Sequence, residues 1–386
     1  MGRIAATSAA DTIAPRSTAR SSFGTRLGRI ALAGLVTAGL WLSATPMPAS
    51  ADAPFGFVGV SAEEVYWASG ADQAQALGQM RANGITELRQ IVRWSDIEQV
   101  QGVNEWRLLD ALILAAARHN IRVLPILGGE VPWATSRPPG DERRCLFPPR
   151  DNATFANHVR QVVARYGPGG TLWQANPDLG SFALKRWQLW NEPNTDTFWA
   201  CDKNPKAYMR LAKAAANAVH DIDPNASIIT GGAPNKAGGD YLRKTFKNGA
   251  KSVFDALALH PYKKTADDVL AEVKQARSLL NDLGAKRWKL RITEFGWATG
   301  GPFHKVHTVD EAKQRRLVKN TYTKLGAQRS KLKLTGVAYY AWRDAPVPTD
   351  FGGGSDYWGN HTGLLRLDAT PKPALSAMLE ASRAIN

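Results

Sequence analysis

The chain has 386 residues, of which 44% are hydrophobic and 9% aromatic, and its 49 Lys and Arg outnumber its 34 Asp and Glu to give a formal charge of +15. This composition excludes a disordered polymer, a collagen and a bundle of membrane spans. The length allows two or three domains of roughly 100 to 200 residues, or one α/β barrel of about 250 residues or more.

The first 51 residues have the features of a secretory signal peptide. A long basic start is followed by an apolar run at residues 30–42, which is too short to span a bilayer comfortably. Ala49-Ser50-Ala51 then supplies the small residues that a signal peptidase accepts. We therefore expect a secreted mature chain of residues 52–386 without a membrane span. An uncleaved membrane anchor is the alternative, because the polar stretch before the apolar run is unusually long.

The basic excess favours contact with anionic surfaces, such as acidic cell-wall polymers or uronate-bearing polysaccharides. The basic residues are scattered, however, and form only short pairs such as Arg143-Arg144 and Arg315-Arg316. No nucleic-acid motif accompanies them, so we expect no nucleic-acid partner. A solvated basic surface explains the same charge and is the simpler interpretation.

The chain contains two cysteines, Cys145 and Cys201. In a secreted protein they either pair or remain as two buried thiols, and both lie in Pro- and Asp-containing sequence that is typical of exposed loops. We expect a disulfide. Neither the number nor the context of the cysteines suggests a metal site.

From residue 54 onward, short β-rich runs alternate with longer segments of helical period, and no linker interrupts the alternation. Eight strands are expected, at residues 55–60, 85–92, 121–127, 183–190, 226–231, 254–260, 288–293 and 334–340. A helix is expected after each of them, and one of these helices has Leu109, Leu112, Ile113 and Ala116 on a single face.

Local signals place some helix ends. Gly84 and Gly284 stand where the first and sixth helices should stop, because glycine readily adopts the left-handed conformation that ends a helix. Thr308, with Glu311 three residues later, predicts a capping box at the start of the seventh helix.

Eight strand–helix units in about 330 residues are what a closed barrel requires. A doubly wound open sheet usually has fewer strands and a Gly-rich phosphate turn near its start, and no such turn follows the first strand here. We therefore predict the α/β class, with a single (β/α)₈ TIM barrel. In such a barrel the chemistry lies at the carboxyl ends of the strands.

Two of the predicted strands run into a glutamate, the fourth at Asn191-Glu192 and the seventh at Glu294. Two carboxylates facing each other across a pocket can cleave a glycosidic bond, since one protonates the leaving oxygen and the other attacks the anomeric carbon or activates water. Asn191 adds an amide that can bind the sugar hydroxyl beside the reacting carbon. Asn and Glu before a Pro also make an ordinary turn, but the two glutamates together are a strong signal.

These residues resemble the clan of retaining β-glycosidases with (β/α)₈ barrels, whose acid/base Glu follows an Asn after strand four and whose nucleophile Glu ends strand seven. The resemblance covers essentially the whole mature chain and is closest to the cellulase-like family 5 and the xylosidase-like family 39. Residues 128–133 lack the His that many family 5 relatives carry after strand three. The matching segments are Arg89 with Trp94-Ser95-Asp96-Ile97-Glu98, His260-Pro261-Tyr262, Tyr340-Ala341-Trp342 and Lys372-Pro373-Ala374.

The resemblance implies roles for these residues. Glu192 would be the general acid/base, protonated at rest, and Glu294 the nucleophile, which Arg89 would keep ionised. Tyr262 could donate its hydroxyl to Glu294, and His260 could bind a sugar hydroxyl or the acid/base. A buried structural ion pair is the alternative for Arg89, and a strand-end histidine with purely structural contacts is the alternative for His260.

Aromatic residues near the strand ends are candidate sugar platforms. The resemblance implies that Trp342 forms the floor under the reacting sugar, and Trp133 and Trp199 could stack on further sugars. Plain packing in the barrel is the alternative for all three.

Two loop features remain. The stretch 343–370 has no helical period and contains Gly352-Gly353-Gly354 and Tyr357-Trp358, and we interpret it as the wall of a substrate cleft. His304 and His307 have the spacing of a metal-binding pair, but no third ligand is near them in the sequence, so we expect no metal.

Together these observations predict a secreted retaining β-glycosidase that cleaves a polysaccharide or oligosaccharide by double displacement. We expect a monomer without a cofactor, whose partner is its carbohydrate substrate and which could also contact an anionic glycan or the cell wall. The alternatives are a catalytically inactive carbohydrate-binding surface protein and a transglycosylase with the same residues, because fold alone does not guarantee activity.

Overall fold

The computed structural model describes residues 53–232, 239–346 and 356–385. The expected signal peptide, the mature start at residue 52 and the glycines 352–354 lie outside the described residues. Within the described ranges, no helix combines the length and the apolar character needed to cross a membrane.

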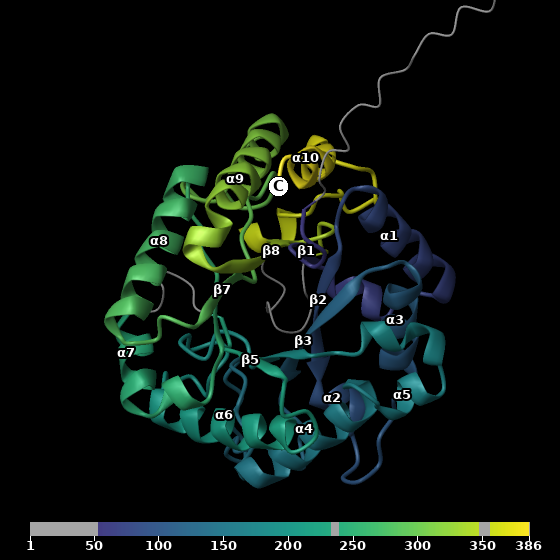
Figure 1. Ribbon diagram of the computed structural model, residues 1–386, viewed down its shortest axis with the longest axis vertical. Coiled ribbons are helices and arrows are strands. Elements are labelled where there is room, and N and C mark those ends of the chain that lie inside the picture. Colours follow the sequence, from purple (N-terminus) through teal and green to yellow (C-terminus); the bar gives the residue numbers. More distant parts are fainter. Residues whose placement is uncertain (1–52, 233–238, 347–355, 386) are drawn as a thin grey trace, which may run out of the picture. The chain divides into compact units, whose positions relative to one another are not determined.

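Eight parallel strands close into a barrel in chain order, and helices surround it (Figure 1). Each strand overlaps its predicted range, so the predicted (β/α)₈ TIM barrel is confirmed. The strands are β1 (Val58–Ser61), β2 (Glu87–Arg93), β3 (Arg122–Gly128), β4 (Arg186–Leu189), β5 (Ser227–Ile229), β6 (Ala256–Leu259), β7 (Lys289–Ile292) and β8 (Leu334–Tyr340).

The barrel closes where β1 pairs with both β2 and β8. In this register Ser61 lies opposite Arg89 on one side and opposite Tyr340 on the other. The carboxyl ends of β1 and β8 therefore lie level with Arg89, and β2 continues beyond it to Arg93.

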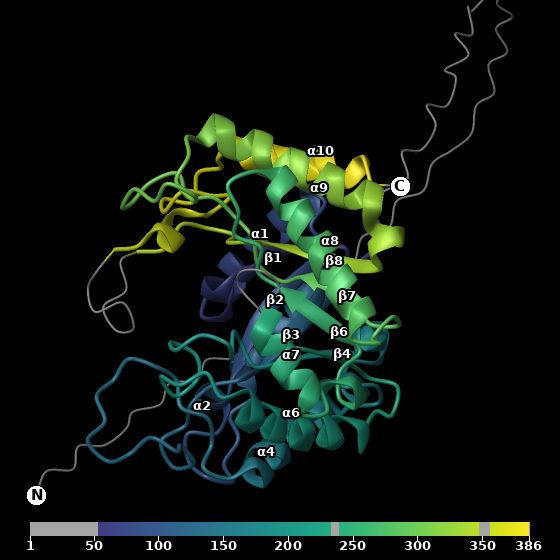
Figure 2. The same ribbon diagram turned by 90° about the vertical axis from the view of Figure 1, so that its left-hand side faces the viewer.

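The helices pack their apolar faces against the barrel, and the predicted face of α3 (Arg107–Arg118) is at most 2% exposed. Helices α9 (Glu311–Leu332) and α10 (Pro373–Arg383) lie side by side in both views (Figures 1 and 2). The helices are α1 (Gly70–Ala82), α2 (Trp94–Ile97), α3 (Arg107–Arg118), α4 (Asn152–Tyr166), α5 (Thr171–Gln174), α6 (Pro205–His220), α7 (Gly239–Lys247), α8 (Ala266–Asp282), α9 (Glu311–Leu332) and α10 (Pro373–Arg383).

The glycine predictions for helix ends are confirmed. Gly84 lies two residues beyond α1 with φ +78°, and Gly284 lies two residues beyond α8 with φ +73°. An L-residue with a side chain would be strained in either position.

The predicted capping box at Thr308 is wrong. Helix α9 begins later, and the side chain of Asp310 caps it by accepting a hydrogen bond from the backbone N–H of Lys313. Glu311 instead binds the guanidinium of Arg366 through both carboxylate oxygens. Asp310 competes successfully because a carboxylate is as good an N-cap as a hydroxyl and also interacts favourably with the helix dipole.

Charged side chains fill the interior near the amino ends of the strands. Glu87, at the start of β2, is 1% exposed, and it pairs with Arg291 of β7 and, at 3.0 Å, with Arg186 of β4. Gly336 of β8 leaves room for this network, because a Cβ there would collide with the Arg291 guanidinium. The carboxyl half of the interior carries the candidate catalytic residues.

A disulfide joins Cys145, in the loop after β3, to Cys201, in the loop after β4, with a Cα–Cα distance of 5.6 Å. The predicted pairing is confirmed. The expectation of exposed surroundings is not met at Cys145, which is 2% exposed.

Candidate active site

A strained turn holds Glu192 at the end of β4. Trp190 and Glu192 have φ of 71° and 42°, in the left-handed region that costs a residue with a side chain about 1–3 kcal/mol. Backbone hydrogen bonds hold the turn, from the N–H of Trp190 to the Leu127 carbonyl at 2.8 Å and from the N–H of Glu192 to the Gly231 carbonyl at 2.6 Å. Such strain persists where the surrounding structure fixes a side chain in one direction, as catalytic sites require.

Glu294 lies two residues beyond the end of β7 and receives two strong hydrogen bonds. Nη1 of Arg89 lies 2.7 Å from Oε1, and the hydroxyl of Tyr262 donates to Oε2 at 2.8 Å. The Glu294 side chain is only 11% exposed. Both oxygens of a nearly buried carboxylate are thus held in place.

The environment of Glu294 favours its ionised form. Burial raises its pKa, but the charges of His260 and Arg89 and the hydrogen bonds from Tyr262 and Arg89 outweigh burial, so that the pKa of Glu294 lies below its usual value. The carboxylate is therefore charged around neutral pH.

His260, which is 0% exposed, connects the two glutamates. Its Nδ1 lies 2.5 Å from Oε1 of Glu192 and 3.4 Å from Oε2 of Glu294, and its Nε2 lies 2.9 Å from the hydroxyl of Thr293. Gly232 permits this position, since a Cβ there would come within 2.5 Å of Nε2. Of the two partners suggested for His260, a sugar hydroxyl and the acid/base, the structure shows the contact with Glu192.

The ligand atoms of Glu192, His260 and Glu294 all lie within 4.8 Å of one another. Two carboxylate oxygens and one imidazole nitrogen could hold a cation. The same two carboxylates, one of them strongly paired and the other hydrogen-bonded to a histidine, could also act as a nucleophile and an acid.

For Arg89 the sequence left two possibilities open, a contact with Glu294 and a buried ion pair, and the structure shows that they are the same contact. Arg89 is 3% exposed and forms a buried ion pair, and the partner in that pair is Glu294 itself. It also donates to Oδ1 of Asn191 at 2.8 Å and to Oε1 of Gln188 at 3.0 Å. Arg89 therefore orients the amide of Asn191 as well as Glu294.

The three tryptophans suggested as sugar platforms lie in different surroundings. Trp342 and Trp199 are each 2% exposed and belong to the hydrophobic core. Their rings offer almost no free surface to a sugar. Trp133 is partly exposed, and its Nε1 donates to the carbonyl of Glu98 at 2.9 Å.

Further aromatic residues pack around Tyr262, which donates its hydroxyl hydrogen bond to Glu294. The ring of Tyr340 lies 6.4 Å from that of Tyr262, and the ring of Trp358 lies 5.1 Å from it on the loop after β8. His307, which stacks on His304 at 4.3 Å, lies 4.2 Å from Trp358. The available signal was position, because Tyr340 is the last residue of β8.

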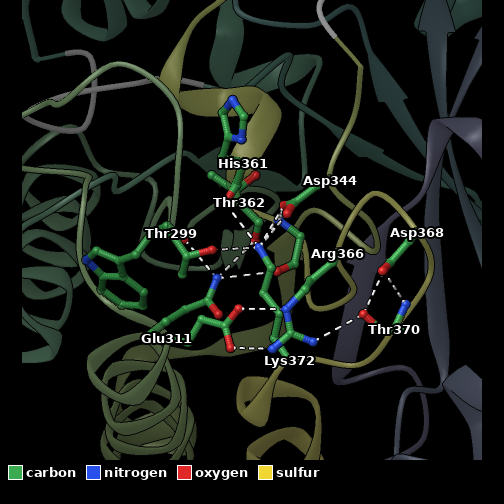
Figure 3. A network of polar contacts seen from close by, with 12 residues as sticks. Thr299, Glu311, Asp344, His361, Thr362, Arg366, Asp368, Thr370 and Lys372 are labelled. Atoms are coloured by element: carbon green, nitrogen blue, oxygen red, sulfur yellow. Dashed lines mark hydrogen bonds and ion pairs between the residues drawn. The ribbon is translucent and has the colours of Figure 1, made fainter.

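Lys372, directly before α10, ties the loop after β8 to the barrel (Figure 3). Its Nζ contacts Asp344 at 2.7 Å and the hydroxyl of Thr299, in the loop after β7, also at 2.7 Å. The backbone N–H of Gly363 donates to the same Asp344 carboxylate at 2.8 Å. The described part of the stretch 343–370 is therefore held by specific contacts and contains one short helical turn at Trp358–His361.

Comparison with known proteins agrees with this arrangement. Residues 183–346, which include both glutamates, match the family model described as the glycosyl hydrolase catalytic core. The resemblance to (β/α)₈ glycoside hydrolases is thus confirmed.

Three similar structures illustrate the likeness of fold. A family 39 glycoside hydrolase from Bacteroides cellulosilyticus WH2 has a TM-score of 0.64 and 19% identity, over 86% of this chain and 64% of that one. A monomeric β-xylosidase from Caulobacter crescentus CB15 has a TM-score of 0.62 and 16% identity, over 85% and 69%. An exo-β-1,4-mannosidase from Opitutaceae bacterium strain TAV5 has a TM-score of 0.58 and 18% identity, over 86% and 60%. The chain thus spans less than two thirds of the length of the first and third proteins.

Proposed function

We propose that this barrel, with its match to a glycosyl hydrolase catalytic core, is a retaining β-glycosidase that hydrolyses O-glycosidic bonds in an oligosaccharide or polysaccharide. One observation carries the proposal: oxygens of Glu192 and Glu294 lie within 4.8 Å of each other at the ends of β4 and β7. Retaining enzymes keep their two carboxyl groups about 5–5.5 Å apart, whereas inverting enzymes need about 6.5–9.5 Å to admit a water.

In the first step an oxygen of Glu294 attacks the anomeric carbon while the bond to the leaving oxygen breaks. Glu192 gives its proton to that oxygen, so the leaving group departs as a neutral alcohol. The side-chain carbonyl oxygen of Asn191 accepts a hydrogen bond from Arg89, so its amide nitrogen can donate to the sugar hydroxyl beside the reacting carbon.

In the second step Glu192, now ionised, takes a proton from a water molecule, which attacks the anomeric carbon. The bond to Glu294 breaks, and the carboxylate returns to its contacts with Arg89 and Tyr262. Two displacements at the same carbon preserve its configuration. We further propose that the protein is secreted and acts as a monomer, as the basic and apolar start of the sequence and the monomeric β-xylosidase of similar fold suggest.

The proposal is tested with a panel of 4-nitrophenyl β-glycosides and β-linked polysaccharides. Proton NMR of the first-formed product should show the β-anomer. An α-anomer would remove Glu294 from the role of nucleophile, and no turnover of any substrate would favour a binding protein.

Azide separates the roles of the two glutamates. Glu192→Ala loses protonation of the leaving group, worth roughly 10² to 10⁴ in rate, yet it still forms the glycosyl-enzyme from an activated substrate, so azide should restore turnover with retention. Glu294→Ala lacks the attacking oxygen, and azide should give the inverted glycosyl azide. The opposite stereochemistry in the two variants would exchange the roles.

A further inference from the structure

Glu63 lies beside the candidate catalytic pair without a role in the mechanism above. It opens the short helical turn Glu63–Tyr66, two residues beyond Ser61 at the end of β1. The Ser61 hydroxyl lies 3.4 Å from Nη1 of Arg89. The backbone N–H of Ile91, two residues beyond Arg89 on β2, lies 3.4 Å from an oxygen of Glu63. A third carboxyl group therefore lies at the same end of the barrel as the reaction centre.

The contacts of Glu63 with the protein are long. Nε2 of Gln90 and the backbone N–H of Ile91 each lie 3.4 Å from its oxygens, and Nη2 of Arg93 lies 3.6 Å away. Its side chain is 31% exposed. These contacts leave good hydrogen-bonding capacity on both oxygens.

Carboxylates with a structural role in the neighbouring loops are bound much more tightly. Glu98 accepts a hydrogen bond from Nε1 of Trp94 at 2.7 Å, and Glu130 accepts one from Nε of Arg137 at 2.7 Å. Burial raises the pKa of Glu63 to about 7, because none of the described residues gives it such a strong donor, even though Arg93 and Arg89 lower the pKa. The group can therefore both accept and donate a proton in a hydrogen bond near neutral pH.

We propose that Glu63 is a substrate-binding residue of this site, whose carboxyl group binds a pair of adjacent hydroxyl groups on an uncharged sugar unit next to the scissile bond. The inference rests on the proposed glycosidase function and deepens it. Its two oxygens can serve two neighbouring hydroxyls at once, which neither Glu192 nor Glu294 can do while engaged in the chemistry.

The charges around Glu63 favour an uncharged sugar over a uronate. Glu64, its neighbour in the chain, and the proposed nucleophile Glu294 are also carboxylic acids. Two arginines on β2 already face carboxylates, since Arg89 pairs with Glu294 and Arg93 pairs with Glu63. Burial raises the pKa values of Glu63 and Glu64 to about 7, so above that pH a uronate group bound there would meet like charge. The basic character of the chain as a whole therefore does not extend to this position.

The test is a cycle that combines deoxygenated substrates with a variant. The wild type is assayed with the best 4-nitrophenyl β-glycoside of the panel and with its monodeoxy forms, and Glu63→Ala and Glu63→Gln are assayed with the same set. For two adjacent positions, we expect removal of the hydroxyl to lower the wild-type kcat/KM by about 10- to 100-fold, as for a hydrogen bond to a charged group. In Glu63→Ala the same removal should cost less than about 3-fold, since the partner is already gone.

A purely structural role would not give this pattern, because it lowers activity equally on all substrates. Glu63→Gln has the same shape and should keep part of the discrimination between the parent glycoside and its monodeoxy forms. It should also lower the ratio of kcat/KM for the uncharged glycoside to kcat/KM for 4-nitrophenyl β-glucuronide. Glu380→Gln is the matched control, since Glu380 is 35% exposed on α10 and pairs with Arg315 and Lys319.

The outcomes separate the inference from the proposed function. If the wild type hydrolyses a glycoside and Glu63→Ala discriminates between the deoxy forms as the wild type does, only the role of Glu63 is overturned. If the wild type prefers the glucuronide, the inference that this position binds an uncharged sugar unit is overturned. If the wild type hydrolyses nothing, the glycosidase proposal falls first and this inference falls with it.

Discussion

Tyr262 is the neutral donor among the groups that hold the carboxylate of Glu294. Its hydroxyl binds Oε2 at 2.8 Å, opposite the oxygen that faces Arg89. The hydrogen bond stabilises the charged form of Glu294 and contributes to its lowered pKa, together with the charges of His260 and Arg89. The proposed nucleophile must be ionised to attack.

Tyr262→Phe should therefore shift the acid limb of the pH profile of kcat/KM to higher pH. Without the hydroxyl the pKa of Glu294 rises, so a larger fraction is protonated and inactive at a given acidic pH. We also expect kcat/KM at its optimum to fall by roughly 10- to 100-fold, the value of a hydrogen bond to a charged group.

The measurement is kcat/KM for an aryl β-glycoside as a function of pH. Tyr241→Phe is the control, because the Tyr241 hydroxyl is buried without a hydrogen bond to any described residue. An acid limb that stays in place in Tyr262→Phe would show that Tyr262 does not tune Glu294.

At the level of single residues, the sequence predicted contacts where strand ends set the geometry. The sequence predicted that three residues, Arg89, Tyr262 and Glu294, lie close together, because the carboxyl ends of parallel strands in a barrel meet at one end. Trp342 could not be placed, since the chain after Tyr340 no longer alternates as a strand does, and its ring lies in the core. Glu63 was missed for the same reason, because it lies in a turn.

At the level of elements, the disulfide joins the loop after β3 to the loop that carries Glu192. Cys145 and Cys201 are 56 residues apart in the sequence. Closing a loop of that length should stabilise the fold by roughly 4 kcal/mol in the chain-entropy model. Reduction should thus lower the melting temperature, and thiol titration of the native protein should find none before reduction. Two titratable thiols in the unreduced native protein would contradict the pairing.

The contact between Lys372 and Asp344 is a second link between elements. The Lys372 side chain is 1% exposed and that of Asp344 is 12% exposed. Lys372→Met should leave a largely buried carboxylate unpaired and lower the free energy of unfolding by about 3–5 kcal/mol, as seen when one partner of a buried pair is removed.

Urea unfolding measures this loss, and Lys319→Met serves as the control. Lys319 pairs with Glu380 on the surface, with 48% and 35% of the two side chains exposed, so its removal should cost no more than about 1 kcal/mol. Equal destabilisation by the two variants would mean that the Lys372–Asp344 pair contributes no more to the free energy of unfolding than a surface pair does.

Element boundaries were harder to predict than element types. The eight strands follow from their apolar and β-branched runs, and all eight exist. The start of α9 was misplaced by a local competition, because Thr308 and Asp310 can each cap a helix and sequence spacing alone favoured the one with Glu311 three residues on.

At the level of the whole molecule, the basic excess should act through the surface and not through the site; residues 52–386 hold 44 Lys and Arg against 33 Asp and Glu, a charge of +11. We expect the protein to bind a polygalacturonate gel at low ionic strength and to be released in 1 M NaCl, where the Debye length is about 3 Å. Hydrolysis of an uncharged aryl β-glycoside should change little over the same range of salt. Retention of the protein on the gel in 1 M NaCl would instead indicate a dedicated site for anionic glycans.

The pairing of β1 with β8 also constrains when the protein can fold. Val58–Ser61 finds one of its two partners in Val337–Tyr340, near the other end of the chain, so nearly the whole polypeptide must be available before the barrel closes. Until then β1 and β7 are open edges with unpaired backbone groups, which attract strands of other chains. A chain truncated before β8 should therefore expose both edges and aggregate, whereas the chain that includes Tyr340 can cover them by closing the barrel.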